Sequence, residues 1–510
     1  MPSSSQHQGL SIELTLTPEP ASTTLWLQGF EGREEISEPF QYAVYLTASK
    51  ALDLDKVIGS KVKLSVQVET GKVVVHGLVL GVRGYDPPPE NASMGAHSYA
   101  LDIRSGLTGL ALHRQNRILG PDAPVKTADV IAKVLAGLQE ATRGNPITLD
   151  QTVDLKAGAD YKDRNFVVQH DESDLAFLSR QCEASGVFFF FKHEDSGELV
   201  FFGDDNISFP EIKGTGAQNP KVPYRSQTEG SVLQFGFTAL SRPAKVSLKD
   251  YDPARPTQPP SSSADVAKGL HGIFHRFGAL VGGPLTPERA AKVRAEELAC
   301  RRMVFRGRSN HAPLRAGTVF ELTSHPNSAF NQRYLIISVE HRAAAPAPTG
   351  YASPIPPRSY ENNFECIPVS VPFRPERRTP IPFVAGVHTA TVDGPTWGGR
   401  AEIDADGRYK VTFVNTAASS TRDKGSDYVR KASPYSGKGD TGLELPLLPG
   451  TEVLIAYLNG DIDYPLILGA VPNADTASVV RQSNQQYNRL RTPSGVVLEM
   501  FDGPAPPATP

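Results

Sequence analysis

The chain has 510 residues and a formal net charge of −3, with 52 basic and 55 acidic residues. This length predicts three or four domains of roughly 150 residues each. The near-neutral charge does not favour nucleic acid or an anionic membrane surface as a partner, so we expect protein partners.

Three cysteines, Cys182, Cys300 and Cys366, lie too far apart in the sequence for a zinc knuckle or a Cys-x-x-Cys redox pair. We expect them to be reduced, buried thiols of a chain that folds in a reducing cytoplasm. The first residues, MPSSSQHQGLSIELTL, lack the basic and apolar regions of a signal peptide. We therefore expect any export to use another route.

Residues 10–82 carry the pattern of a β domain, with short β-branched runs separated by glycines, as in VKLSVQVETGKVVVHGLVLGV. Three helices are predicted after it. The first begins at Thr127, where apolar residues between 130 and 138 keep helical spacing. Ser173 can cap the second, which ends at Gly186. The third begins at Thr286, with Pro287 in its first turn.

Residues 185–204, SGVFFFFKHEDSGELVFFGD, predict a β-hairpin with a polar turn. The apolar run at 187–191 is far shorter than the roughly 20 residues of a membrane span. Its first strand is apolar on both faces and must be covered on both sides. The second cover is either a helix of the same chain or another copy of the chain.

Two segments suggest an internal duplication. Residues 57–83 and 314–342 each have a glycine, a strand, a turn and a second β-branched strand that ends at a basic residue. Chance similarity between two hairpins is the alternative interpretation. A duplication would give two related barrels in each chain.

The C-terminal part has a different organisation. Residues 346–382 are rich in proline and predict an extended strap. Between 386 and 473, strand patterns recur at roughly ten-residue spacing, which predicts a small closed barrel, with the OB fold as the leading choice. Near the end, Val496, Leu498 and Met500 alternate onto one face of a strand that cannot bury this face alone.

Candidate metal and catalytic residues favour structural roles. Glu402, Asp404, Asp406 and Gly407 imitate the start of a calcium loop, but Phe413 stands where the loop needs a glutamate, so a hairpin turn is expected. A second group, His170, Asp171, Glu172 and Asp174, precedes a helix, where carboxylates favour the positive end of the dipole. A third group, His311, His325 and His341, lacks metal-ligand spacing.

We therefore expect no catalytic, cofactor-binding or metal-binding residues and no cofactor, and we expect the protein not to be an enzyme. No nucleophile elbow, P-loop or dinucleotide fingerprint is present in the sequence. Residues 386–475 hold 8 Lys and Arg against 12 Asp and Glu. The resulting net negative charge opposes binding of the barrel to a phosphate backbone.

Several segments together resemble the VgrG family, the trimeric spike proteins of type VI secretion and related contractile injection systems. They are FEGREEISEPFQYAVYL, RNFVVQHDESDLAFLSRQCEASGVFFFFKHED, FECIPVSVPFRPERRTPIPFVAGVHTATVDGP, DADGRYKVTF and LPLLPGTEVLIAYLNGDIDYPLILGAVPNA. Two stretches depart from the family pattern, VNTAAS after YKVTF and DYVRKASPYSG, which lack the usual tryptophans. The surface of the barrel is therefore expected to meet different neighbours.

The resemblance implies a mainly β fold with some α: a phage-hub-like region with two β-barrel domains at 1–345, the strap at 346–382, an OB-fold barrel at 383–475, and a neck with the start of a trimeric β-helix needle at 476–510. It also implies a structural spike that forms a homotrimer, caps a tube of Hcp-like hexamers, carries a PAAR-type tip, and delivers effectors through the target envelope. Baseplate components would be further partners, and nucleic acid would not. The target membrane would be contacted mechanically.

We expect assembly in the bacterial cytoplasm and export by contraction of the apparatus. One alternative is a phage-type tail hub with a cell-wall hydrolase activity, and another is the spike of an extracellular contractile particle. The homotrimer is also expected from the two apolar strands at 187–191 and 496–500, which a monomer would not easily cover. If each chain holds two similar barrels, three chains present six, which match a hexameric tube ring.

Overall fold

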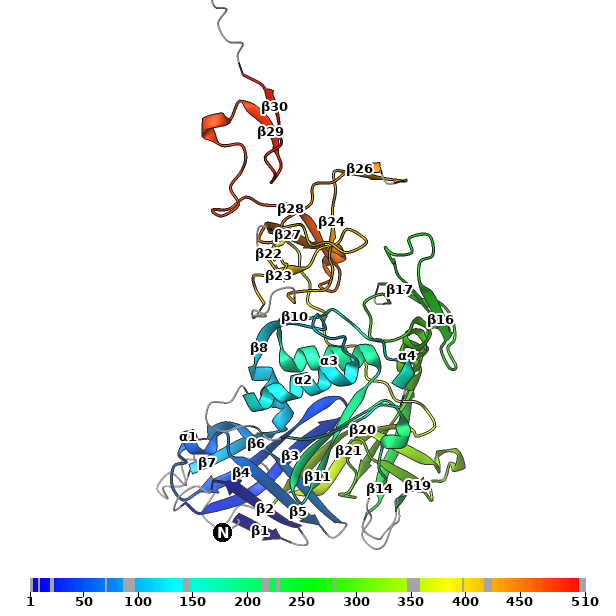
Figure 1. Ribbon diagram of the computed structural model, residues 1–510. Coiled ribbons are helices and arrows are strands. Elements are labelled where there is room, and N and C mark those ends of the chain that lie inside the picture. Colours follow the sequence, from blue (N-terminus) through cyan, green and yellow to red (C-terminus); the bar gives the residue numbers. More distant parts are fainter. Residues whose placement is uncertain are drawn as a thin grey trace, which may run out of the picture. The chain divides into compact units, whose positions relative to one another are not determined.

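The computed structural model describes residues 3–7, 10–18, 23–68, 71–85, 97–140, 147, 149–156, 158–212, 220–225, 230–278, 280–345, 358–396, 399–416, 424–439 and 441–503 (Figure 1). Strands predominate among the elements, as predicted. The chain forms two compact units. The first contains Met1–Arg114, Val125–Arg164 and Glu172–Pro380, and the second contains Gln115–Pro124, Asn165–Asp171 and Ile381–Pro510.

A thirteen-stranded sheet is the main element of the first unit, and its strands run side by side in the blue, green and yellow parts of Figure 1. The sheet order is β1-β2-β5-β6-β7-β4-β3-β20-β21-β18-β14, with β19 beside β20 and β13 beside β19. The strand bounds are β1 (Ser3–His7), β2 (Leu10–Thr17), β3 (Leu25–Glu35), β4 (Glu38–Ala48), β5 (Lys61–Val68), β6 (Gly71–Tyr85), β7 (His97–Arg104), β13 (Lys221–Pro223), β14 (Val232–Ala239), β18 (Met303–Ser309), β19 (Val319–Thr323), β20 (Arg333–Ala344) and β21 (Arg358–Pro368).

Five strands of this sheet recur as a second set of five with the same pairings. In the first set, β3 pairs with β4, β4 with β7, β7 with β6 and β6 with β5, all antiparallel. In the second set, β14 pairs with β18, β18 with β21, β21 with β20 and β20 with β19, again all antiparallel. The order along the chain is also the same. We call β3 to β7 the first repeat, and β14, β18, β19, β20 and β21 the second repeat.

Two irregularities of the ladders fall at equivalent places in both repeats, while the further shifts at Arg33/Glu35 and Arg342/Ala344 have no counterpart in the described pairings. A register shift interrupts the first and the third pairing of each repeat, at Leu27/Gly29, Val232/Gln234, Val79/Gly81 and Ile336/Ser338. Bulges of this kind bend a strand locally and are specific features of a sheet, not random defects. Their coincidence favours a duplication over chance similarity, because two unrelated hairpin sheets would not share both bulges.

The two segments whose sequences suggested a duplication occupy equivalent hairpins, β5–β6 and β19–β20. Before each hairpin a glycine takes a positive φ, 89° at Gly59 and 77° at Gly317. The Gly59 amide donates to the Val79 carbonyl at 2.8 Å, and the Gly317 amide donates to the Ile336 carbonyl at 2.9 Å. Both glycines are required by this left-handed turn, since other residues rarely adopt it.

Each repeat encloses its own apolar core. Residues of the first core alternate inward along β2 to β7 and include Tyr42, Val44 and Leu101. The second core includes Phe305 and Phe364 among the inward residues of β18 to β21. In the second repeat, an isolated bridge between Tyr224 and Val232 joins the end of β13 to the start of β14. The sheet therefore curls around each core while β3 and β20 keep the two repeats continuous.

The predicted strap at 346–382 needs a correction for residues 358–368. These residues form β21, which pairs with β20 on one side and with β18 on the other. Tyr360, Asn362, Phe364 and Cys366 alternate into the interior and are all buried. Proline content was the wrong guide here, because the period-two alternation of a strand lies between the proline-rich stretches. Residues 346–357 of the predicted strap lie outside the described residues.

The three predicted helices are α2 (Thr127–Glu140), α3 (Asp174–Ser185) and α4 (Pro287–Cys300), and a short α1 (Leu54–Val57) precedes β5. The Ser173 hydroxyl accepts from the Ala176 amide at 3.2 Å and caps α3, and Gly186 ends this helix with a φ of 68°. Pro287 stands in the first turn of α4. The short 3-10 helices are Gly106–Leu112, Gly158–Asp160, Asn206–Ser208, Ser328–Phe330, Leu458–Gly460 and Gln482–Asn484.

The predicted phenylalanine-rich hairpin forms as β11 (Phe188–Glu194) and β12 (Gly197–Gly203), with β9 (Asp150–Asp154) beside β12. Phe188, Phe189 and Phe190 are each at most 2% exposed within a single chain. Phe191 contacts the ring of Phe40 at a centroid distance of 5.1 Å. Of the two covers left open by the sequence, the structure therefore supplies the one within the chain, so this strand gives no support to the expected trimer.

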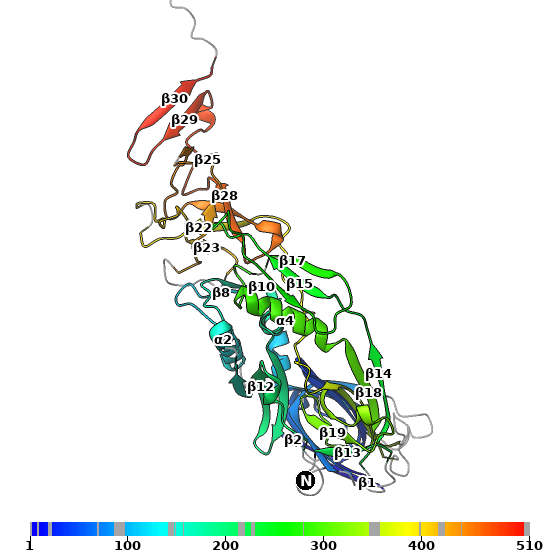
Figure 2. The same cartoon turned by 90° about the vertical axis from the view of Figure 1, so that its right-hand side faces the viewer.

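Smaller sheets complete the first unit. β15 (Lys245–Lys249) lies between β16 (Ser261–Asp265) and β17 (Ile273–Phe277), in the connection from β14 to β18 that also carries α4. Figure 2 shows β14 and β18 side by side, as their pairing requires. A pair formed by β8 (Arg114–Leu119) and β10 (Val167–Ser173) lies mostly in the segments assigned to the second unit.

The second unit contains the predicted small barrel. Its sheet has the order β23-β22-β27-β28-β24, from β22 (His388–Val392), β23 (Val411–Phe413), β24 (Arg430–Lys431), β27 (Glu452–Tyr457) and β28 (Pro465–Ala470). Tyr409 and Val429, which precede the two outermost strands, exchange backbone hydrogen bonds of 2.9 and 2.7 Å and close the barrel. A small hairpin, β25 (Tyr435–Gly437) and β26 (Thr441–Leu443), forms a separate sheet.

The sequence predicted a single apolar strand near the C-terminus. The structure instead shows a hairpin of β29 (Tyr487–Arg491) and β30 (Val497–Phe501). Its apolar side chains remain uncovered by their own chain: Leu498 is 62% exposed and Met500 is 61% exposed. A partner for the backbone is present, whereas a cover for the side chains is not found among the described residues.

Candidate functional site

The joint between the two repeats contains a buried polar network. β3 of the first repeat pairs with β20 of the second, with Glu34 opposite Val339 and Gly32 opposite His341. Further backbone hydrogen bonds extend the pairing at both ends, from the Ile36 amide to Ile337 at 3.0 Å and from the Ala345 amide to Gln28 at 2.7 Å. The two repeats therefore behave as one sheet.

A buried ion pair lies at this joint. The Arg315 Nε donates to Glu34 Oε2 at 2.9 Å, and a second guanidinium nitrogen also contacts this carboxylate. The Tyr42 hydroxyl donates to Glu34 Oε1 at 2.5 Å. The Ala316 amide adds a further hydrogen bond of 3.3 Å to Glu34 Oε2. The carboxylate of β3 is thus held by groups from both repeats.

Electrostatics keep this carboxyl charged. Burial alone would raise the pKa of Glu34, but the Arg315 guanidinium and the hydrogen bonds from Arg315 and Tyr42 outweigh burial and lower the pKa to about 2. Burial lowers the pKa of the neighbouring His341 to about 4. His341 accordingly stays neutral near pH 7, where its Nδ1 lies 2.7 Å from the Tyr360 hydroxyl. This network fixes geometry and offers no exposed group for proton transfer.

The sequence reasoning missed this network. Glu34 and Arg315 are 281 residues apart, so no local pattern could pair them. One signal was present: strand alternation places Glu34 on the same inward face as Phe30 and Gly32. A charged residue at an inward position requires a buried partner, because an unpaired buried charge is strongly unfavourable.

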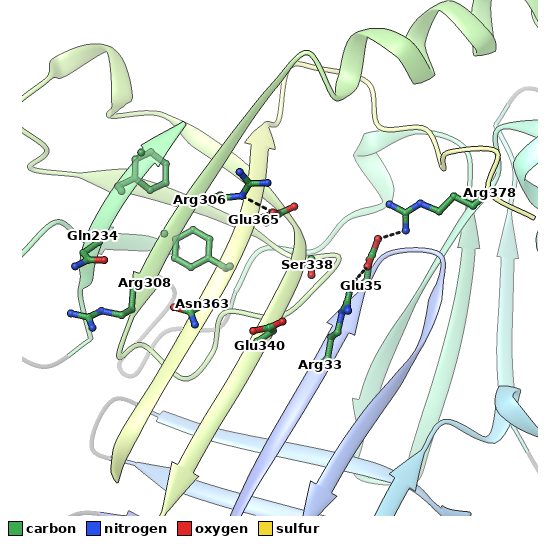
Figure 3. Close-up of a pocket in the computed structure, with 14 residues that line it drawn as sticks. Arg33, Glu35, Gln234, Arg306, Arg308, Ser338, Glu340, Asn363, Glu365 and Arg378 are labelled. Atoms are coloured by element: carbon green, nitrogen blue, oxygen red, sulfur yellow. Dashed lines mark hydrogen bonds and ion pairs between the residues drawn. The ribbon is translucent and has the colours of Figure 1, made fainter. Parts of the chain in front are cut away.

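A polar groove of about 700 Å³ lies on the outward face of the same sheet (Figure 3). Arg306 and Glu365 form an ion pair across β18 and β21 at 2.7 Å. Glu35 contacts both Arg33 and Arg378, at 2.9 and 2.8 Å (Figure 3). The groove therefore contains both positive and negative groups, and several of them are paired with each other. Three residues of β14 also line it: Gln234, Phe235 and Gly236.

Burial raises the pKa of three carboxyls outside the joint, Glu38, Glu183 and Glu198. Burial raises the pKa of Glu198 to about 7, despite a 3.0 Å hydrogen bond from the Gly106 amide and a contact with the Ser105 hydroxyl. Perturbed carboxyls occur at catalytic sites and in structural networks alike. Both oxygens of Glu198 are used to fix the turn after β7, so the arrangement is structural.

The structure separates the residues of the His170 group. Glu172 forms a buried ion pair with Arg180 at 2.6 Å, and Asp174 contacts His113 at 2.8 Å. The ring of His170 lies against that of His388, with centroids 4.9 Å apart. The cap of the helix is Ser173. The group is not brought together as one site.

The loop that imitates a calcium site forms the predicted hairpin turn. Asp404 Oδ1 accepts from the Asp406 amide at 3.0 Å and from the Arg408 amide at 2.9 Å, and Gly407 has a φ of 71°. Arg408 Nε also donates to Asp404 Oδ2 at 2.7 Å. The carboxylate therefore closes the turn with its own backbone.

The three histidines of the third group are dispersed. His341 lies in the joint, and His311 is buried without a hydrogen-bond partner for either ring nitrogen among the described residues. His325 lies beside Tyr224 and accepts from the Asn327 amide at 3.0 Å. Within the described ranges, no three or more His, Cys, Asp or Glu side chains are placed to share a metal ion. The expectation of a metal-free, cofactor-free role stays a prediction.

All three cysteines are buried and free, as predicted from their spacing. Burial raises the pKa of Cys182, Cys300 and Cys366, which keeps them as thiols. Of the helices that the structure describes, none is both long and apolar enough to cross a bilayer.

Known proteins match most of this chain. Residues 33–347 match the family model described as phage tail baseplate hub (GPD), and this range includes the joint and most of both repeats. The type VI secretion system spike protein VgrG4b of Pseudomonas aeruginosa is 29% identical over 487 residues, which cover 91% of this chain and 57% of that protein. The chain spans a little over half the length of the curated relatives that it matches, 57%, 55% and 59% for three of them.

Solved structures share the fold. The E. coli c3393 protein, described as a component of the type VI secretion system with structural similarity to T4 bacteriophage tail proteins gp27 and gp5, matches with a TM-score of 0.62 and 23% identity. The match covers 90% of this chain and 99% of that chain. A chain of the half-lidded Francisella PdpA-VgrG complex matches with a TM-score of 0.56 and 11% identity over 96% of this chain and 81% of its own length.

Proposed function

The chain belongs to the phage tail baseplate hub family, and on this premise we propose that it is a structural hub and spike component of a contractile injection machine. The predicted resemblance to VgrG spike proteins is confirmed by the curated relatives. This similarity favours type VI secretion as the machine. In that role three copies cap a hexameric tube, and contraction drives them through the target envelope together with effectors.

The duplication of the five-stranded repeat carries this proposal. One chain holds two copies of the same ladder, joined edge to edge through β3 and β20. Three chains hold six. A ring of six similar repeats matches a sixfold tube at one end, while the three chains continue as a threefold spike at the other. Repeated heterologous contacts need such a match of rotation to close a ring.

The C-terminal hairpin supports association of several copies. Leu498, Met500 and Phe501 are each at least half exposed. A two-stranded hairpin with uncovered apolar side chains is marginal in water by itself. Contact with the same hairpin of two other copies would bury these side chains and begin a trimeric needle. A PAAR-type protein at the tip, Hcp-like hexamers at the wide end, baseplate components and effectors complete the proposed set of partners.

The proposed role is mechanical and does not include catalysis. Three carboxylates that the sequence analysis considered as candidates have structural partners. Glu172 forms an ion pair with Arg180, Asp174 contacts His113, and Asp404 accepts from backbone amides of its own turn. The competing role, a hub with cell-wall hydrolase activity, predicts lysis of purified cell walls by the isolated protein. We expect no lysis in that assay, and measurable lysis would favour the competing role.

We also propose assembly in the cytoplasm and export by the apparatus itself. Secretion of the chain that depends on the contractile sheath is the expected result in a strain carrying the machine. Release of the chain in intact free particles instead would favour an extracellular contractile device, and its presence in virions would favour a phage tail.

The test of the proposed function is assembly of the full chain. We expect a trimer at micromolar concentration by mass photometry, six similar lobes in end-on electron microscopy averages, and cosedimentation with tubes of the hexameric protein. Leu498→Asp should weaken the trimer, whereas the matched control Leu270→Asp, at a leucine that is 77% exposed in the first unit, should not. A stable monomer, or a ring without six similar lobes, would contradict the proposal.

A further inference from the structure

Two histidines from separate segments of the sequence meet in the second unit. His170 lies in β10 and His388 is the first residue of β22, and both are half-buried. Their ring centroids are 4.9 Å apart, and the ring planes are inclined by 59°. Residues 165–171 and the barrel belong to the same compact unit. The contact therefore joins the short segment 165–171 to a strand of the barrel.

Both rings direct one nitrogen at the same atom. Nδ1 of His170 and Nδ1 of His388 each lie 3.3 Å from Nδ2 of Asn415, which follows β23 and is exposed. An amide nitrogen has two hydrogens to donate, so it is compatible with two neutral imidazoles that both accept at Nδ1. In this tautomer the Nδ1 lone pairs of the two histidines converge on one point at the surface.

The distance between the rings fits a pair of histidine ligands. Zn²⁺ binds imidazole nitrogen at about 2.0–2.1 Å with tetrahedral geometry. With bonds of this length and a tetrahedral angle, the centroids of two ligating rings lie roughly 5 Å apart. The observed separation of 4.9 Å is close to this value. The rings therefore need little rearrangement to bind one ion between them.

The side chain of Asn415 offers a third ligand. Rotation about its last side-chain bond exchanges Nδ2 and Oδ1, and an amide oxygen is an established type of metal ligand. Because Asn415 is exposed, its side chain is free to move outward by the small distance that an ion between the rings requires. Water completes a four-coordinate shell at such a surface site.

The surroundings favour neutral imidazole, which is the form that binds metal ions. Burial lowers the pKa of His170, the neighbouring His388 lowers it further, and the Asp171 carboxylate opposes both. The Tyr457 ring packs edge-on against His388 with centroids 5.6 Å apart. Burial raises the pKa of Tyr457 to about 12, so its hydroxyl stays protonated. Asp171 thus adds negative charge near the two rings, and Tyr457 positions one of them.

We propose that His170, His388 and the side-chain oxygen of Asn415 bind one divalent transition-metal ion of the class that prefers imidazole, represented by Zn²⁺. The inference goes beyond the proposed function, because the mechanical role does not require an ion. It also departs from the sequence-based expectation of no metal-binding residues. Local spacing does not reveal the site, since His170 and Asn415 are 245 residues apart and the third ligand is an amide.

The expected consequence is an exchangeable clamp within the second unit. Only two of the ligands are imidazoles, and no third His, Cys, Asp or Glu of the described chain joins them as a ligand. The ion ties residues 165–171 to β22 and to the segment after β23. An apolar contact of Phe166 with Phe413, at a centroid distance of 6.5 Å, lies between the same segments. Protons compete for the same ring nitrogens, so acid pH and chelators release the clamp.

Titration calorimetry of the full chain with ZnCl2 at pH 7.5 tests the site, and we expect one ion per chain there. His170→Gln and His388→Gln each remove an imidazole. Each should weaken Zn²⁺ binding at least about tenfold, since even the loss of an outer-shell group costs about 10–100-fold. His275→Gln is the matched control, because His275 is an exposed histidine of the first unit, and it should leave the affinity unchanged.

Asn415 gives a second arm that a folding defect does not imitate. Asn415→Asp places a carboxylate oxygen where the amide oxygen would bind. It should raise the affinity for Zn²⁺ at least about tenfold, since the charge of the ligands tunes the affinity of oxygen sites. Asn415→Ala should lower the affinity. CaCl2 in place of ZnCl2 should show no dependence on the two histidines, because Ca²⁺ takes oxygen ligands.

Hydrogen exchange measures the clamp directly. At a ZnCl2 concentration about ten times the dissociation constant, amide exchange of residues 165–171 through opening of this contact should slow by about tenfold. His388→Gln should abolish the slowing. Exchange that is unchanged by Zn²⁺, or that is slowed equally in this variant, would overturn the clamp.

The outcomes also separate this inference from the proposed function. If the unmodified chain binds no Zn²⁺, or binds it no more tightly than His170→Gln/His388→Gln protein, the proposal is overturned. A cluster held only by hydrogen bonds of the Asn415 amide gives that result. Trimer formation and cosedimentation with tubes in the presence of EDTA test the proposed function separately, so each inference fails or stands without the other.

Discussion

The two repeats of the main sheet share a ladder and differ in their connections. In the first repeat, β3 passes to β4 through a tight turn in which Ser37 has a φ of 69°. In the second repeat, the equivalent connection between β14 and β18 contains β15, β16, β17 and α4. The pairings and two of the bulges are nevertheless the same. The comparison teaches that the sheet ladder carries the duplication, while a surface connection can accept a long insertion without changing it.

The repeats also differ in how their edges are used. Glu34 and Arg315 bring an ion pair to the joint within the chain. The positions equivalent to them in the other repeat, by the matching ladders and glycine turns, are the apolar Ala239 and Val57. The ion pair is therefore specific to the joint that links the two repeats within the chain.

The largest expected effect on stability comes from breaking the buried ion pair between Glu34 and Arg315. Arg315→Met leaves the Glu34 carboxylate buried without its ion-pair partner, which typically costs about 3–5 kcal/mol of unfolding free energy. Urea unfolding near pH 7 measures this loss. Arg333→Met is the matched control, because Arg333 forms an exposed ion pair with Glu211 and should change stability by less than about 1 kcal/mol.

The ion pair between Glu34 and Arg315 should also make the unfolding free energy depend on pH, and a second substitution should compensate for its loss. The folded pKa of Glu34 is about 2, below the roughly 4.3 of an unfolded glutamate. Its contribution is therefore present above pH 4.3 and is lost as the pH falls from about 4.3 to 2. Arg315→Met should flatten this acid dependence. Addition of Glu34→Leu should restore most of the stability, since replacing both ions of a buried pair is often neutral. A double variant as unstable as the single one would contradict the role of the pair.

A smaller effect separates the two equivalent glycines. Alanine at Gly59 meets no atom within 4 Å, so only the left-handed backbone opposes it, at a cost of about 1–2 kcal/mol. Alanine at Gly317 would also place its Cβ 2.6 Å from the Phe190 ring, which adds about 1–3 kcal/mol of overpacking. Thermal unfolding of the two variants measures the difference. Equal losses would show that the ring of Phe190 moves aside freely.

An effect of similar size concerns the acid sensitivity of the second repeat. His311 is buried, and burial lowers its pKa to about 4. Unfolded histidine has a pKa of about 6.5 and binds protons more readily, so stability is complete above pH 6.5 and falls as the pH drops towards 4. At pH 5 the loss from this residue is about 2 kcal/mol. The equivalent residue of the first repeat, at the end of β4, is the apolar Ala48.

His311→Leu should therefore flatten the dependence of stability on pH between 6.5 and 4. Differential scanning calorimetry at pH 5 and pH 8 gives the slope for the variant and the unmodified chain. Only the difference between the two pH values matters, so a constant change in packing does not affect the result. An unchanged slope would indicate that the histidine becomes hydrated before the chain unfolds.

Local features of the fold were predictable from the sequence. The cap at Ser173, the terminating Gly186 and Pro287 in the first turn of α4 act within a few residues, so their signals are read directly. The short strands of the second unit were predicted for the same reason. The strand at residues 358–368 was missed because its alternation lies between prolines, and composition was given more weight than period.

Long-range relations were not predictable to the same degree. The duplication was visible in the sequence only as a weak similarity, because equivalent positions share their inward orientation but not their residue type. Tyr42 and Phe305 are one such pair, both buried but different in residue type. The ion pair between Glu34 and Arg315 depends on the pairing of β3 with β20, which local pattern does not specify. The phenylalanine-rich strand was predicted correctly as part of a hairpin, but the sequence left open what covers it, because the ring of Phe40 is distant in sequence.

The division of the chain into two units has a mechanical consequence. The backbone passes between the units at residues 114/115, 124/125, 164/165, 171/172 and 380/381. A pulling or pushing load on one unit is therefore shared by several covalent connections, and cleavage of any single one leaves the units tethered. A shortened protein that stops at residue 380 would also expose Ile118 and Phe166 to solvent. Two of their apolar neighbours in the second unit, Val384 and Ile462, come after that point in the chain.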